Sequence, residues 1–111
     1  MQLPAMAKKR SRQRTSYEDE GSRLRKLAST PGISLAFSRH AEDEMRKDGI
    51  VKLDIANMLK RCMVTKIEDC RDETSWRAEG KDNDGRKIAA EVVVYEDRIR
   101  IKIVTAWVNR K

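Results

Sequence analysis

The side chains best suited to acid–base chemistry are His40, the only histidine, and Tyr95 near the carboxyl end of the chain. Histidine is the only side chain whose ordinary pKa lies near neutrality. Cleavage of RNA through its 2′-hydroxyl needs a base, an acid that protonates the leaving oxygen, and cations that hold the phosphate. His40 can act as base or acid, with Tyr95 as a secondary proton donor. The alternative is a structural His40 at a helix start, bonded to Glu44 or to a strand carbonyl.

Cations that can hold a phosphate lie on the strands expected near the carboxyl end. Arg98, Arg100 and Lys102 alternate along one run, so they share a face, since successive strand residues point to opposite sides. Arg77, on an earlier strand, is predicted to join them. These four side chains are candidate ligands for RNA, and also for DNA. In the alternative interpretation they are solvated, and Arg77, Glu91 and Lys102 form cross-strand pairs.

The amino-terminal region carries most of the excess positive charge. The net charge is +7, and residues 1–28 hold eight Lys/Arg against three acids, whereas the rest of the chain holds seventeen against fifteen. Residues 1–15 are polar and lack periodicity, so we expect a disordered basic arm. Such an arm attracts phosphates without reading sequence, or serves only solubility. Its cations, which we count as candidate nucleic-acid ligands, are Lys8, Lys9, Arg10, Arg12 and Arg14.

Two hairpins account for the second half of the chain. Strands are expected at 64–69, 75–81, 87–95 and 98–107. Gly85 suits a three-residue turn in which Asp82 pairs with Arg86, which places Trp76 opposite Val92. In the next hairpin, Tyr95 is predicted to pair with Arg98. One face then carries Ile88, Ala90, Val92, Val94, Ile99, Ile101, Ile103 and Thr105, and the other carries Glu91, Val93, Tyr95, Arg98, Arg100 and Lys102.

Helices are expected before these strands. A short helix at 17–28 is followed by a linker, and Ser38 can cap a helix that ends at Gly49. Apolar residues at helical spacing predict another helix at 53–62. The predicted fold is therefore α+β, with two helices packed on one face of a four-stranded antiparallel sheet and a basic N-terminal arm. The organisation is an arm at 1–15, a short helix and linker at 16–36, and a domain at 37–111.

The two cysteines, Cys62 and Cys70, fit neither a zinc site nor a disulfide framework. No acidic or histidine cluster has ligand spacing, so we expect no metal and no other cofactor. The sequence has no apolar run long enough to span a bilayer, and Met1–Arg10 lacks the hydrophobic stretch of a signal peptide. We therefore expect a cytoplasmic protein with reduced thiols and no membrane association.

Several short motifs resemble a bacterial family of domains of unknown function. They are Phe37-Ser38-Arg39-His40-Ala41 with Met45 one turn later, Gly49-Ile50, Asp54-Ile55, Gly80-Lys81-Asp82 and Val104-Thr105-Ala106-Trp107. That family is similar to the RelE and BrnT toxins, which have small αα-ββββ domains. The resemblance implies a toxin that cleaves RNA as a metal-independent endoribonuclease and has an antitoxin partner. The alternative is a non-catalytic module that binds nucleic acid or protein, such as a phage-borne or accessory regulator or inhibitor, because a fold does not settle function.

Overall fold

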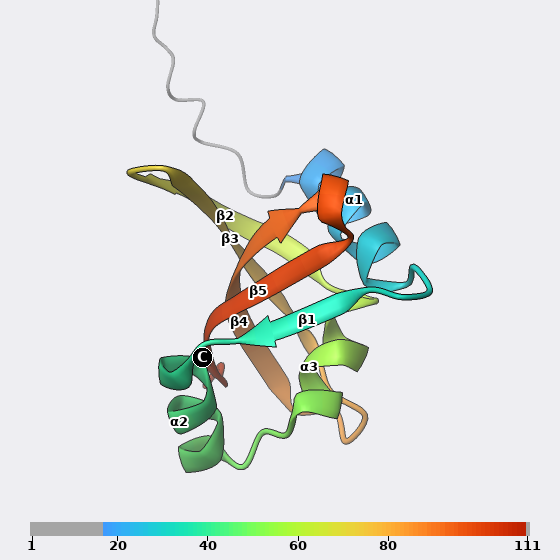
Figure 1. Ribbon diagram of the computed structural model, residues 1–111. Helices are drawn as coiled ribbons and strands as arrows, with labels where there is room; N and C mark the ends of the chain where they lie inside the picture. The colour runs from blue at the N-terminus through green and yellow to red at the C-terminus, as the bar shows by residue number, and fades with distance from the viewer. Residues whose placement is uncertain (1–16, 111) are drawn as a thin grey trace, which may run out of the picture.

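The computed structural model describes residues 17–110, and its centre is a five-stranded sheet (Figure 1). The strand order is β1-β5-β4-β3-β2, in which β1 runs parallel to β5 and the other neighbours are antiparallel. Along the chain the elements are α1 (Glu18–Ala28), β1 (Ser34–Phe37), α2 (Arg39–Asp48), α3 (Lys52–Leu59), β2 (Met63–Cys70), β3 (Glu73–Lys81), β4 (Lys87–Tyr95), the 3₁₀ turn η2 (Glu96–Arg98) and β5 (Arg100–Val108).

The α+β class is confirmed, but the predicted four-stranded antiparallel sheet with two helices is wrong in detail. The described residues form three helices and a five-stranded mixed sheet. The additional strand is β1, which lies in the segment predicted as a linker and pairs Leu35 with Ile101 and Phe37 with Ile103. Four residues are too few to show a reliable alternating pattern, and the partner strand is far away in the sequence.

All three helices contribute to one hydrophobic core on the same face of the sheet, which we call the inner face. Leu24 of α1, Met45 of α2 and Ile55 of α3 are buried together with Ile101 and other strand residues. The boundaries of α2 are as predicted. The Ser38 hydroxyl accepts a hydrogen bond from the Ala41 N–H at 2.9 Å, and Gly49 ends the helix with φ +67°.

The β3–β4 hairpin has the predicted register. The Asp82 N–H donates to the Arg86 carbonyl at 3.0 Å, and Gly85 has φ +86°. Trp76 pairs with Val92, and Arg77 pairs with Glu91 on the opposite, outer face. Turn chemistry and hydrophobic alternation therefore specify the same pairing.

The predicted β4–β5 register is wrong by two residues at the turn. Tyr95 pairs with Arg100 rather than Arg98, because η2 and Ile99, with φ +49°, lengthen the connection. A shift of two preserves the faces, so Ile101 and Ile103 remain inside. A bulge beside Val104 then reverses the alternation, which puts Ala106 on the inner face instead of Thr105.

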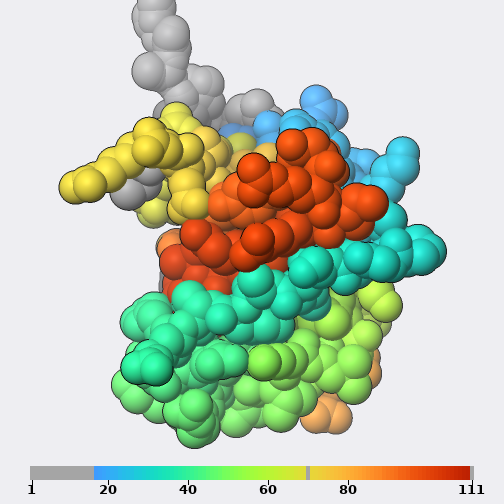
Figure 2. All heavy atoms as spheres, viewed as in Figure 1, coloured from blue at the N-terminus to red at the C-terminus, as the bar shows by residue number. Residues whose placement is uncertain are grey.

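The β2–β3 hairpin projects beyond the body of the molecule (yellow in Figure 2). Its strands pair from Met63 to Cys70, whereas the pairing of β3 with β4 extends only to Ser75. The end of this hairpin therefore lies beyond the paired part of the sheet, and it is linked to the end of β4 by the bond from the Tyr95 hydroxyl to Glu73.

A candidate nucleic-acid interface on the outer face

Tyr95, Glu73 and Lys102 meet on the outer face near the β4–β5 turn. The Tyr95 hydroxyl donates to Glu73 Oε2 at 2.7 Å, and Lys102 Nζ lies 3.1 Å from the same oxygen. The hydrogen bond from Tyr95 lowers the pKa of Glu73, and Lys102 adds to this effect. The same bond raises the pKa of Tyr95. The result is an ionised carboxylate next to a phenol that keeps its proton.

Two arginines lie over the ring of Tyr95. The guanidinium carbon of Arg98 is 5.6 Å from the ring centroid, and that of Arg100 is 5.9 Å away. The Arg100 Nε is buried and has no hydrogen-bond partner in the structure. Neither arginine pairs with an acidic side chain among the described residues. Their charges are therefore available to an anion, and a guanidinium can bind a phosphate through two parallel hydrogen bonds.

Arg77 lies further along the outer face and is partly neutralised. Its guanidinium is 3.6 Å from Glu91 and 5.3 Å from the ring centroid of Trp107. The predicted row of Arg77, Glu91 and Lys102 is correct for the first two residues and wrong for Lys102. Because of the longer β4–β5 turn, Lys102 stands opposite Val93.

His40 is exposed at the start of α2, in a shallow depression with Asp43, Glu44 and Lys47. It forms no hydrogen bond to Glu44 or to a strand carbonyl within the described residues. The hydroxyl of Ser38, two residues before His40, donates to the Val104 carbonyl, and the four residues from Val104 to Arg100 span about 13 Å of strand. The structure therefore brings Tyr95, Arg98, Arg100 and Lys102 together and leaves His40 apart from them.

Glu73 is the member of the candidate site that sequence analysis missed. Its position follows from the predicted register, because extrapolating the pairing of Trp76 with Val92 by three residues, beyond the last observed pair of Ser75 with Val93, places Glu73 opposite Tyr95. The strand predicted from the sequence begins only at residue 75, which leaves Glu73 outside it. The predicted arm residues Lys8 to Arg14 lie outside the described residues.

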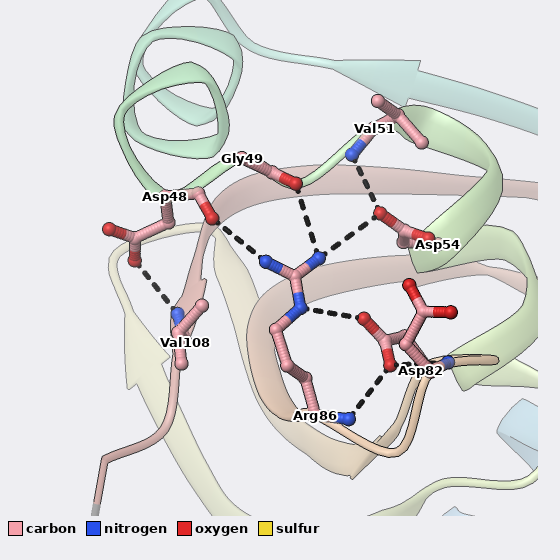
Figure 3. A network of polar contacts seen from close by, with 8 residues as sticks. Asp48, Gly49, Val51, Asp54, Asp82, Arg86 and Val108 are labelled. Atoms are coloured by element: carbon pink, nitrogen blue, oxygen red, sulfur yellow. Dashed lines mark hydrogen bonds and ion pairs between the residues drawn. The ribbon is translucent and has the colours of Figure 1, made fainter.

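A second polar cluster is centred on Arg86 and is structural (Figure 3). Asp82 has a buried carboxylate that accepts from the N–H groups of Asp84 and Arg86 and from Arg86 Nε. The bond from the Arg86 side chain lowers the pKa of Asp82. The guanidinium also donates to the carbonyls of Asp48 and Gly49. This cluster fastens the β3–β4 turn to the connection between α2 and α3.

The described side chains also bear on metal binding and on thiol chemistry. They include no group of three or more His, Cys, Asp or Glu side chains that could hold a metal ion. Burial raises the pKa of the Cys62 thiol to about 11, so it stays protonated near neutrality and is a poor nucleophile. None of the helices within residues 17–110 has the length and apolar composition needed to cross a membrane.

The segment between the motif at the start of α2 and the motif at the end of β5 matches a known family of domains. The chain belongs to the family described as domain of unknown function DUF4258, whose model matches residues 37–108. No curated protein and no solved structure shows a significant match. The family membership agrees with the predicted family of uncharacterised domains.

Proposed function

We propose that this protein binds RNA on the outer face of its sheet and cleaves it as a metal-independent endoribonuclease. A toxin of this kind, with an antitoxin partner, is what the resemblance to RelE and BrnT implies. The observation that supports cleavage is the bond between Tyr95 and Glu73 beside the cations Arg98, Arg100 and Lys102. A base, an acid and phosphate ligands are thereby gathered within one cluster, as the reaction requires.

Each group has a role in the proposed step. Glu73 takes the proton of the 2′-hydroxyl, whose oxygen attacks phosphorus and forms a 2′,3′-cyclic phosphate. The bond from phosphorus to the 5′-oxygen breaks, and Tyr95 gives its proton to that oxygen. The proton on Glu73 then returns to Tyr95 through their hydrogen bond, while Arg100 and Lys102 neutralise the phosphate. In this mechanism Glu73 replaces His40 as the base, because it lies beside Tyr95 whereas His40 does not.

Cleavage is tested with the full chain and an end-labelled single-stranded RNA in buffer containing EDTA. We expect products with a cyclic phosphate end, and a loss of rate of about 100-fold or more for Tyr95→Phe and for Glu73→Gln. His40→Ala and the exposed control Arg46→Ala should keep the wild-type rate. Loss of cleavage in His40→Ala, with Glu73→Gln active, would refute this assignment of the base.

Toxicity is tested by inducing the protein in bacteria and plating. We expect growth inhibition by the wild type and relief by Tyr95→Phe. A wild type that neither inhibits growth nor cleaves RNA would refute the endoribonuclease proposal.

A non-catalytic binding module is the second candidate, and the charge pairing on the outer face favours it. Lys102 is held by Glu73 and Arg77 by Glu91, so the face is less cationic than its sequence suggests. In this case RNA affinity should fall steeply with salt, Arg100→Ala should weaken it, and no product should form. Duplex DNA in the same titration tests whether the ligand is RNA.

A further inference from the structure

A groove of about 500 Å³ lies at the opposite end of β4 from Tyr95. Its side chains come from the connection before β2, from β2, β3 and β4, and from the residue after β5: Arg61, Met63, Glu79, Lys81, Lys87 and Asn109. Glu79 and Lys81 alternate on β3 with inner-face residues, and Lys87 pairs with Lys81. The groove therefore opens on the same outer face as the Tyr95 cluster, and its volume is in the range of ligand sites.

A fixed carboxylate lies in this groove. Glu79 Oε2 accepts from the Thr65 hydroxyl at 2.9 Å, and Oε1 accepts from the Asn109 amide at 3.2 Å. Neither bond involves a cation, and no described lysine or arginine forms an ion pair with Glu79. A carboxylate oxygen can accept two hydrogen bonds, so each oxygen retains one acceptor position. The site thus offers two parallel acceptors to a ligand.

The surroundings of the carboxylate suit a nucleotide. Met63 is 57% exposed and offers apolar surface against which a base can lie. Lys81 and Lys87 are exposed, and no described acidic side chain pairs with them, so they can hold phosphates or a carbonyl oxygen. An acceptor pair among cations excludes simple anions and favours a ligand that has both adjacent donors and negative charge.

We propose that this groove reads a guanine of the bound RNA, through Glu79. Guanine is the base with two neighbouring donors, N1–H and the N2 amino group, on its Watson–Crick edge, and single-stranded RNA exposes that edge. The eight residues from Lys87 to Tyr95 span about 26 Å, so the guanine lies several nucleotides from the phosphate at the Tyr95 cluster. The inference rests on the proposed RNA binding, but it does not require cleavage.

The test is fluorescence anisotropy of the full chain with labelled oligouridines that differ at one central position. We expect at least about fivefold tighter binding with guanosine than with adenosine, uridine or inosine, which lacks the N2 amino group. Glu79→Gln should abolish this preference and leave the affinity for all-uridine RNA within about twofold. Glu91→Gln, which changes another outer-face carboxylate, is the matched control and should keep the preference.

The outcomes distinguish the proposed guanine site from the proposed binding of RNA. Equal affinity of the wild type for all four oligonucleotides would overturn the guanine site and leave RNA binding intact. Absence of binding to any RNA would overturn both. Retention of the preference in Glu79→Gln would show that another group reads the base. The wild-type comparison is decisive by itself if that variant does not fold.

Discussion

Arg86 connects the β3–β4 turn to the connection between α2 and α3, which lies 32 to 38 residues earlier in the sequence, so its truncation is the sharpest test of what holds the fold together. Its guanidinium donates to Asp82 at 2.8 Å, to the Asp48 and Gly49 carbonyls at 2.9 and 3.1 Å, and to Asp54 at 3.4 Å. Arg86→Met keeps the aliphatic length and removes every donor. The buried Asp82 carboxylate would then keep only its two backbone bonds.

The expected loss of unfolding free energy for Arg86→Met is about 2–4 kcal/mol. A hydrogen bond contributes about 1 kcal/mol net, and more when a charged group takes part, so four bonds set an upper limit near 5 kcal/mol. The sum is reduced because about a third of the Arg86 side chain is exposed, where water replaces part of the loss, and because the bond to Asp54 is long. For a domain of this size the change corresponds to a fall in Tm on the order of 10–20 °C.

The assay is urea denaturation followed by tryptophan fluorescence and circular dichroism. Arg46→Met is the matched control, because Arg46 also pairs with an aspartate, at 3.0 Å, but is 73% exposed. That pair should contribute less than about 1 kcal/mol. If the two variants differ by less than about 0.5 kcal/mol, the Arg86 cluster does not hold the segments together.

Three further predictions concern single contacts. Ser38→Ala removes the helix cap on Ala41 and should cost about 1–2 kcal/mol by the same assay; an unchanged midpoint would contradict this. Gly49→Ala should cost about 1 kcal/mol in unfolding free energy, and this cost comes from the φ of +67° alone, since a Cβ there meets no atom closer than 3.8 Å. Gly49→Asn should cost less. Ionised Glu73 stabilises the fold above its ordinary pKa, and this contribution is lost as pH falls through its lowered pKa. Tyr95→Phe should therefore reduce acid sensitivity, measured by denaturation at pH 7 and 3; equal sensitivity would refute the bond.

The two hairpins show where local sequence determines structure and where it does not. In β3–β4 the residue that must take positive φ is Gly85, so the turn could be identified from the sequence. In β4–β5 the corresponding residue is Ile99, with φ +49°, and a β-branched residue gives no sign of such a conformation. The predicted register of β4 against β5 is therefore wrong by two residues, although the predicted faces of the residues near the turn are correct.

The candidate site was partly predictable for the same reason. Alternation along β5 placed Arg100 and Lys102 on the face of Tyr95, and the pairing with β4 preserved this. The separation of His40 from these residues depends on how α2 leaves β1. That placement follows from the parallel pairing of β1 with β5, which no local pattern indicated. Sequence therefore specified neighbours along strands better than neighbours across the fold.

The folded unit is larger than the segment that defines the family. The family match begins at residue 37, yet Leu24 of α1 is fully buried in the core and β1 forms one edge of the sheet. Three contacts fasten α1 and its N-cap residue to the sheet and its connections: the Tyr17 N–H donates to the Val64 carbonyl at 3.1 Å, Arg25 donates to the Cys62 carbonyl at 2.8 Å, and Arg23 pairs with Glu96 at 2.6 Å. The last contact lies in η2, immediately after Tyr95. Because α1 supports both the core and the turn that carries the candidate site, experiments on the outer face require the chain that includes α1.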